Sequence, residues 1–96
     1  MLYVLICTDK PNSTALRLEV RPRHLAYIEQ HKVSIPIAGP FVSEDGVTMM
    51  GSLIVVEAAD LAAAQEFSKS DPYTQAGLFS SVDIKPWRWT LGAPKV

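Results

Sequence analysis

The sequence predicts one α+β domain whose strands form a single antiparallel sheet. Two observations support this prediction: strand-like and helix-like segments alternate along the chain, and prolines occur in only two of the four strand-like segments. Ninety-six residues are enough for one domain and too few for two. An apolar share of 48% with a charged share of 20% is typical of a folded globular chain rather than a disordered one.

Hydrophobic periodicity and turn signals divide the chain into six main elements. The opening run, Leu2–Cys7, is apolar throughout and rich in β-branched and aromatic residues, which favours a strand. Residues 44–46, Glu-Asp-Gly, predict a hairpin-like turn. The expected elements are, in order, a strand at residues 2–7, a helix at 13–32, strands at 33–43 and 47–57, a helix at 61–69 and a strand at 82–91.

The first helical segment has Leu18, Leu25 and Ile28 on one apolar stripe, with charges such as Arg17 elsewhere. Pro22 interrupts this segment. Either a short helix ends near residue 20 and a second begins with Pro22 in its first turn, or one helix is kinked at Pro22.

Two aspartates mark later helix starts. Asp60 is the expected N-cap of the helix at 61–69. Asp71 is the expected N-cap of a further helical turn that reaches about Gly77, with Pro72 at its first position, where a missing N–H does no harm.

Proline placement predicts the order of the strands in the sheet. Pro36 and Pro40 fall in the second expected strand and Pro86 in the fourth, whereas the first and third have none. Because proline cannot donate to a ladder on both sides, the second and fourth strands belong at the edges. With the order strand, helix, strand, strand, helix, strand, this predicts a ferredoxin-like βαββαβ arrangement with a four-stranded antiparallel sheet.

Both faces of the central strands are expected to avoid water. In the first strand both alternating sets of side chains are apolar, and the same holds for residues 53–56 of the third. Two helices can cover one face, which leaves the other as a large apolar patch. We therefore expect a homodimer through the sheet face, a dimeric α+β barrel.

Charge and cysteine content exclude several classes of function. The formal net charge of −1 offers no basic field for nucleic acid. No apolar run reaches the roughly 18 residues of a membrane span, so no membrane partner is expected. The single cysteine, Cys7, cannot form an intramolecular disulfide and is expected to be an inert core thiol, which together with the lack of a secretion signal indicates a cytoplasmic protein.

The candidate catalytic residues are His24 and Asp71. No metal or nucleotide motif is present, and no cofactor is expected. His24 lies at the border of the apolar helix stripe, where it is either a partly exposed histidine or a functional one. Asp71 is either a simple N-cap or a carboxylate that also orients an imidazole, and the two roles can coexist because a carboxylate has two oxygens.

Five further residues are candidates for substrate binding. Arg21 lies three residues from His24 on the same helix. Gly39 and Pro40 lie late in an expected edge strand, where glycine permits close approach by a ligand or simply allows a bend. Ser52 is small and leaves space, although a small residue under a helix is ordinary. Tyr73 either donates a hydrogen bond to a ligand or fills the core.

Several short segments together resemble the YCII-related domain family. They are Arg21-Pro22-Arg23-His24-Leu25, Ala38-Gly39-Pro40, Gly51-Ser52, the run from Asp71 to Leu78, and Lys85-Pro86-Trp87, and the match spans nearly the whole chain. The resemblance implies a ferredoxin-like fold paired into a dimeric α+β barrel, over a domain of residues 1–91 with a short tail at 92–96. It also implies an active-site pair at His24 and Asp71. The loop at 43–47 is shorter than in many members, which predicts a more open pocket.

These observations allow more than one function. The first is a small enzyme in which His24 is the general acid or base and Asp71 orients it, for elimination, dehalogenation or isomerisation of a small organic substrate. The second is a non-catalytic module that binds a small molecule or anion through His24, Arg21 and a helix start. A third is a dimeric partner subunit whose apolar sheet face serves association.

Overall fold

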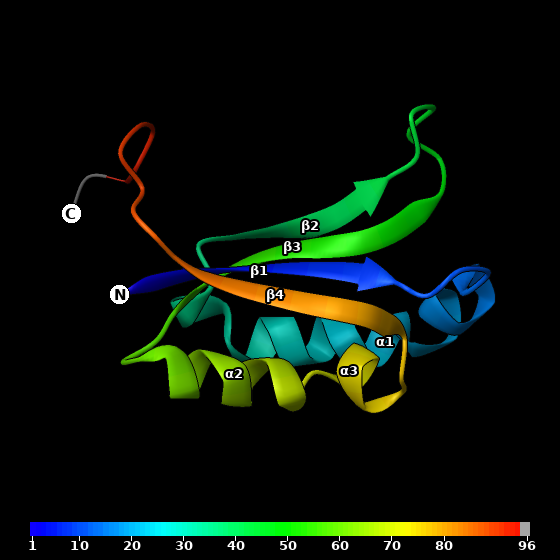
Figure 1. Cartoon of the computed structure of the whole chain (residues 1–96), viewed down its shortest axis with the longest axis horizontal. Helices are drawn as coiled ribbons and strands as arrows, with labels where there is room; N and C mark the ends of the chain where they lie inside the picture. Colours follow the sequence, from blue (N-terminus) through cyan, green and yellow to red (C-terminus); the bar gives the residue numbers. More distant parts are fainter. Residues whose placement is uncertain (95–96) are drawn as a thin grey trace.

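Four antiparallel strands form a sheet in the order β2-β3-β1-β4, and all the helices lie against one of its faces (Figure 1). The computed structural model describes residues 1–94; residues 95–96, the end of the expected tail, lie outside the described residues. The elements are β1 (Leu2–Asp9), α1 (Thr14–Gln30), a 3₁₀ turn (Lys32–Ser34), β2 (Ile37–Val42), β3 (Met49–Glu57), α2 (Leu61–Lys69), α3 (Pro72–Gln75) and β4 (Phe79–Trp87). This is the ferredoxin-like α+β fold, as the sequence predicts.

The strand order confirms the argument from proline. Pro40 lies in β2 and Pro86 in β4, and both strands are at sheet edges. Pro36, however, lies just before β2, so its assignment to a strand was wrong. β1 pairs with both neighbours along nearly its whole length, with Leu5 opposite Ile54 on one side and Ile84 on the other.

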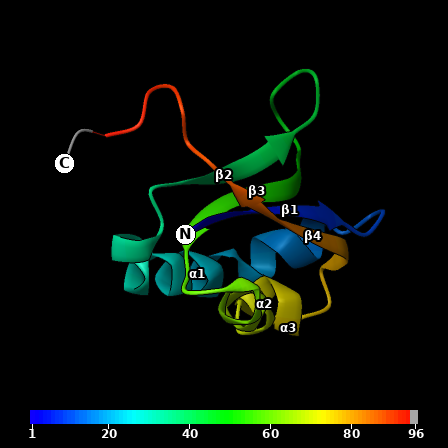
Figure 2. The ribbon, with the colours of Figure 1, turned by 60° about the vertical axis from the view of Figure 1, so that its left-hand side comes forward.

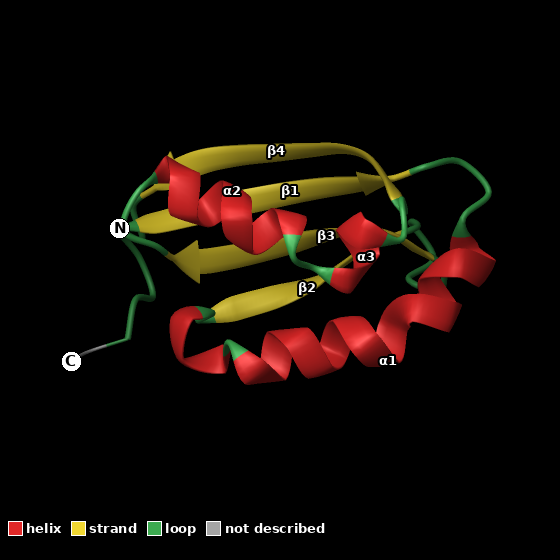
Figure 3. Ribbon diagram, turned by 90° about the horizontal axis from the view of Figure 1, so that it is seen from below, coloured by secondary structure: helices red, strands yellow, loops and turns green. Residues whose placement is uncertain are grey.

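The helices and the sheet enclose the core between them (Figures 2 and 3). Alternate residues of β1 and β3 point at the helices, and among them Leu5 and Ile54 are 1% exposed. Ala64 of α2 and Leu78, just before β4, complete this buried layer. The side chains of β1 and β3 that point the other way form what we call the open sheet face. A shallow hollow of about 380 Å³ on it is lined by Val4, Ile6, Ile37, Leu53, Val55, Lys85, Pro86 and Trp87.

Helix α1 is continuous through Pro22, which excludes the alternative of two separate helices. Its buried residues are Arg17, Val20 and His24. The expected stripe was therefore wrong in part, because Leu18 is 54% and Leu25 46% exposed. Two polar side chains occupy the buried face, and each is paired with a buried carboxylate, which offsets the cost of removing it from water.

Several element boundaries differ from those expected, and two of the differences have clear physical reasons. The second strand begins at Ile37 rather than residue 33, because residues 32–34 form the 3₁₀ turn and Val33 is 97% exposed. The fourth strand occupies Phe79–Trp87 rather than 82–91. Its partner β1 spans Leu2–Asp9, with Leu2 opposite Trp87, so residues beyond Trp87 have no strand to pair with.

The predicted caps and turn are present. Oδ1 of Asp60 accepts a hydrogen bond from the backbone N–H of Ala63 at 2.8 Å, and α2 begins at Leu61. In the hairpin between β2 and β3, Oδ1 of Asp45 accepts from the backbone of Val47, and Gly46 adopts a φ of +78°, a conformation that glycine tolerates best. Within residues 1–94, no helix has the length and apolar character needed to cross a membrane.

Candidate functional site

The side chains of His24 and Asp71 meet beneath the sheet. Nδ1 of His24 lies 2.9 Å from Oδ1 and 3.1 Å from Oδ2 of Asp71, and the two residues are 8% and 2% exposed. His24 comes from α1, and Asp71 is the N-cap of α3, where its Oδ1 also accepts the backbone N–H of Tyr73 at 2.9 Å. The cap and the histidine partner are therefore the same carboxylate.

This contact determines which nitrogen of His24 carries the proton. An ionised carboxylate only accepts hydrogen bonds, so Nδ1 is the protonated nitrogen in the neutral ring. Nε2 has no hydrogen-bond partner among the described residues, and His24 lines a cavity. The basic lone pair of the neutral imidazole is thereby left to a ligand.

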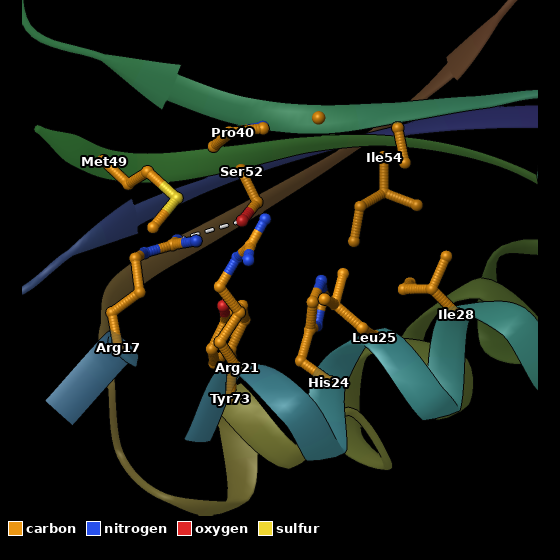
Figure 4. A pocket seen from close by; sticks show the side chains of 12 residues that line it. Arg17, Arg21, His24, Leu25, Ile28, Pro40, Met49, Ser52, Ile54 and Tyr73 are labelled. Atoms are coloured by element: carbon orange, nitrogen blue, oxygen red, sulfur yellow. Dashed lines mark hydrogen bonds between the residues drawn. The ribbon is translucent and has the colours of Figure 1, made fainter. Parts of the chain in front are cut away.

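The Tyr73 ring stacks against the face of the His24 ring. The two rings stack with centroids 4.0 Å apart and planes 18° from parallel, and the guanidinium carbon of Arg17 lies 4.5 Å from the Tyr73 centroid. Tyr73 thus lies between Arg17 and His24, which are two helical turns apart on α1 (Figure 4). At 1% exposure, Tyr73 fills the core, as one of its two expected alternatives had it, and it also contributes to the cavity wall.

Arg17 is fixed by an ion pair that the sequence did not reveal. Nε donates to Oδ2 of Asp9 at 2.7 Å and Nη2 donates to Oδ1 at 2.9 Å, a bidentate pair in which Arg17 is 2% exposed. Nη2 also donates to Oγ of Ser52 at 3.0 Å. This arrangement connects the end of β1, the first turns of α1 and β3.

The cavity lies between α1 and the β2–β3 side of the sheet and has a volume of about 240 Å³ (Figure 4). Six of the seven site residues expected from the sequence line it, and Asp71 lies behind His24. Its walls are formed by Arg17, Arg21, His24, Leu25, Ile28, Ala38, Gly39, Pro40, Met49, Ser52, Ile54 and Tyr73. Gly39 is opposite Leu53, whose side chain belongs to the open sheet face. A side chain at position 39 would therefore point away from the cavity, so Gly39 contributes only backbone atoms to it.

Arg17 was placed away from the buried stripe by the sequence argument, and the structure corrects this. Arg17, Arg21 and His24 are separated by four and three residues, a spacing that puts all three on one side of a helix. That spacing was a usable signal for Arg17. Asp9 is the last residue of β1, but in the sequence it begins a run of turn formers at residues 9–13, and nothing there distinguishes it from an ordinary loop aspartate.

Burial and neighbouring charges define the ionisation of three groups. Burial disfavours the charged guanidinium, but the hydrogen bonds and charge of Asp9 outweigh it and raise the pKa of Arg17. Burial raises the pKa of the Tyr73 hydroxyl above its usual value, although Arg17 and Arg21 oppose this, so Tyr73 is a protonated donor at neutral pH. Burial, aided by the charge of Asp71, raises the pKa of the Cys7 thiol to about 12.

Comparison with known proteins identifies the family. The model of the YCII-related domain matches residues 1–88, and the chain belongs to this family, as the resemblance predicted. Protein YciI of Escherichia coli is 36% identical over 95 residues, which cover 92% of this chain and 97% of that protein.

Two solved structures share the fold of this chain. The 5-chloro-2-hydroxyhydroquinone dehydrochlorinase TftG of Burkholderia phenoliruptrix, solved in complex with 2,5-dihydroxybenzoquinone, is 33% identical with a TM-score of 0.85, covering 92% of this chain and 94% of TftG. The cofactor-independent oxygenase SnoaB of Streptomyces nogalater has a TM-score of 0.56 and 14% identity, covering 96% of each chain, and shares the fold alone.

Proposed function

We propose that this protein is a small enzyme that performs general acid/base chemistry on a small organic substrate with His24 and Asp71. The observation that carries the proposal is the buried hydrogen bond from Nδ1 of His24 to Asp71, in a ring whose Nε2 is left to the cavity. A positioned imidazole with a fixed carboxylate partner is a general base that works without a cofactor.

The reaction class we propose is elimination, dehalogenation or isomerisation. In a dehydrochlorination, Nε2 of neutral His24 takes a proton from a carbon or hydroxyl of the substrate. The electron pair released forms the new double bond, and chloride leaves with the electrons of the carbon–chlorine bond, so that HCl is lost overall. Asp71 stabilises the imidazolium that forms, and water takes up its proton to restore the neutral ring.

A relative supports this choice of chemistry. TftG, which is 33% identical to this chain, is a dehydrochlorinase of a hydroxylated ring. The cavity of about 240 Å³ is smaller than the 300–1,000 Å³ of pockets that hold drug-sized ligands, so it suits a molecule of about one ring.

The working unit in this proposal is a cytoplasmic homodimer. The open sheet face carries the apolar side chains of Val4, Ile6 and Leu53 in the middle of the sheet, where water would otherwise contact them. A second copy stacked on this face would cover it in both chains at once. Cys7 is buried as a free thiol, which fits a reducing compartment.

The proposal is tested by turnover. The purified protein is incubated without oxygen with 5-chloro-2-hydroxyhydroquinone and related chlorinated hydroquinones, and chloride release and quinone absorbance are followed. We expect release by the natural protein and at least about a 100-fold loss in His24→Gln. His31→Gln is the matched control, because His31 ends the same helix and does not line the cavity.

Two outcomes would contradict the proposal. Equal turnover by His24→Gln and the natural protein would exclude His24 as the acid or base. Thermal stabilisation by these compounds with no product on long incubation would instead indicate the binding module.

A further inference from the structure

The walls of the cavity present hydrogen-bond donors on several sides. Arg17 uses Nε and Nη2 for Asp9 and Ser52, which leaves its Nη1 without a carboxylate partner. Because Oγ of Ser52 accepts from Arg17, the Ser52 hydroxyl proton is free to point elsewhere. Arg21 is exposed, lines the cavity and has no ion pair within residues 1–94.

The carboxylates near the cavity are already occupied and lie behind the donors. Asp9 is held by Arg17, and Asp71 by His24 and the backbone of Tyr73. Among the described residues that line the cavity there is no Asp or Glu, whereas there are two arginines. The polar part of a largely apolar lining is therefore rich in donors and positive charge, and it has no carboxylate acceptor among the described residues.

Arg17 makes this surface rigid. A guanidinium with freedom of movement loses entropy when it binds a ligand, but Arg17 is held by a bidentate pair, by Ser52 and by the face of Tyr73 before any ligand arrives. A buried, fixed cation that lines a cavity is preorganised to stabilise an oxyanion there.

We propose that the cavity selects ligands bearing an oxyanion on about one ring, a carboxylate, phenolate or enolate, and that Arg21 with the Arg17–Ser52 pair binds this oxygen. This specificity rests on the proposed function, for which it defines the substrate class: the oxyanion lies against the arginines while Nε2 of His24 reaches the reacting atom. The same preference for an oxyanion is expected if the cavity binds a ligand without reacting with it.

Binding of a matched pair of probes tests the proposal. Benzoate and benzamide have nearly the same size and shape, but only benzoate is an anion. By calorimetric titration of the intact protein at low salt, we expect benzoate to bind at least about tenfold more tightly than benzamide. Added NaCl is expected to weaken benzoate binding and to leave benzamide binding unchanged.

Variants assign the preference to the arginines. Arg21→Gln is expected to remove most of the preference for benzoate, since it deletes an exposed cation without opening the core. Arg23→Gln, an exposed position of the same helix outside the cavity, is expected to keep it. Equal affinity for the two probes, no benzoate binding at millimolar concentration, or an unchanged preference in Arg21→Gln would overturn the proposal.

His24→Gln separates this inference from the proposed function. The variant lacks the acid/base group but keeps both arginines, so we expect it to retain the preference for benzoate. If chlorinated hydroquinones are not turned over and benzoate is still preferred, the proposed chemistry fails and the oxyanion site stands. If turnover is found without any preference for the anion, the oxyanion site fails and the chemistry stands.

Discussion

The carboxylate of Asp71 contacts Nδ1 of His24 at 2.9 Å, although 47 residues separate the two along the chain. The same carboxylate is the N-cap of α3, so the helix start and the orientation of the imidazole depend on one side chain. This dual use restricts substitution more than either role alone. An amide side chain can replace a carboxylate as an N-cap, but it cannot replace the carboxylate that orients a histidine and stabilises its imidazolium.

Asp71→Asn separates the two roles. Asparagine is a good N-cap, so we expect α3 to form and the free energy of unfolding to fall by no more than about 1 kcal/mol. The neutral amide no longer stabilises imidazolium and can favour the wrong tautomer of His24, so turnover should fall by at least about 100-fold. Urea unfolding and steady-state kinetics measure the two effects.

Asp60→Asn is the control for this variant, since Asp60 also caps a helix through a backbone N–H, that of Ala63, and does not line the cavity. It should change neither turnover nor stability appreciably. A turnover in Asp71→Asn close to that of the natural protein would contradict the role assigned to the charge of Asp71.

The ion pair between Arg17 and Asp9 gives a second prediction, on stability. Arg17→Met fills similar space but leaves the Asp9 carboxylate, whose side chain is 7% exposed, without its cation. Breaking a buried pair by removing one partner costs about 3–5 kcal/mol. Adding Asp9→Asn should recover part of this loss, because no unpaired charge then stays buried.

Urea unfolding of the single and double variants measures this coupling. Lys32→Met is the comparison, because Lys32 and Glu29 form a pair that is mostly exposed, and its loss should change stability by less than about 0.5 kcal/mol. If Arg17→Met were as mild as Lys32→Met, the pair would not be a structural anchor of the cavity.

The fold was predictable because its signals are local. Pro40 and Pro86 each lack a backbone N–H, which indicates that their strands lie at the edges of the sheet. The caps at Asp60 and Asp71 depend on residues only two or three positions away. The end of the last strand was not predictable in this way. It is determined by where its partner β1 begins, at Leu2, which is a tertiary fact.

The candidate site was predictable only in part. His24 and Asp71 were singled out by their positions and by the family resemblance, and the structure brings them together. Arg17 was missed because hydrophobic periodicity assigns an arginine to the solvent side, and only its pairing with Asp9 overrides that rule. Because Arg17 and His24 occupy the buried side of α1, Leu18 lies on the exposed side.

A third prediction concerns the reactivity of Cys7. The thiolate is the reactive form, and burial raises the pKa of this thiol from 9.0 to about 12 while leaving it 1% exposed. At pH 8 the folded protein should therefore react with a thiol reagent such as DTNB at least about 100-fold more slowly than the protein in urea. Rapid labelling of the folded protein at pH 8 would show that β1 opens readily or that Cys7 is not in the core.

The open sheet face gives the last prediction, on association. Leu53 lies in β3, one of the two central strands, on the side of the sheet away from the helices, and only partly buried. Leu53→Lys would place a charge in the middle of a sheet-to-sheet contact, where no partner compensates it, and it should convert a dimer to a monomer. Sedimentation velocity at micromolar concentration measures this change. Val33→Lys, at a position 97% exposed, should remain dimeric. A natural protein that sediments as a monomer, or a Leu53→Lys variant that sediments as a dimer, would rule out association through this face.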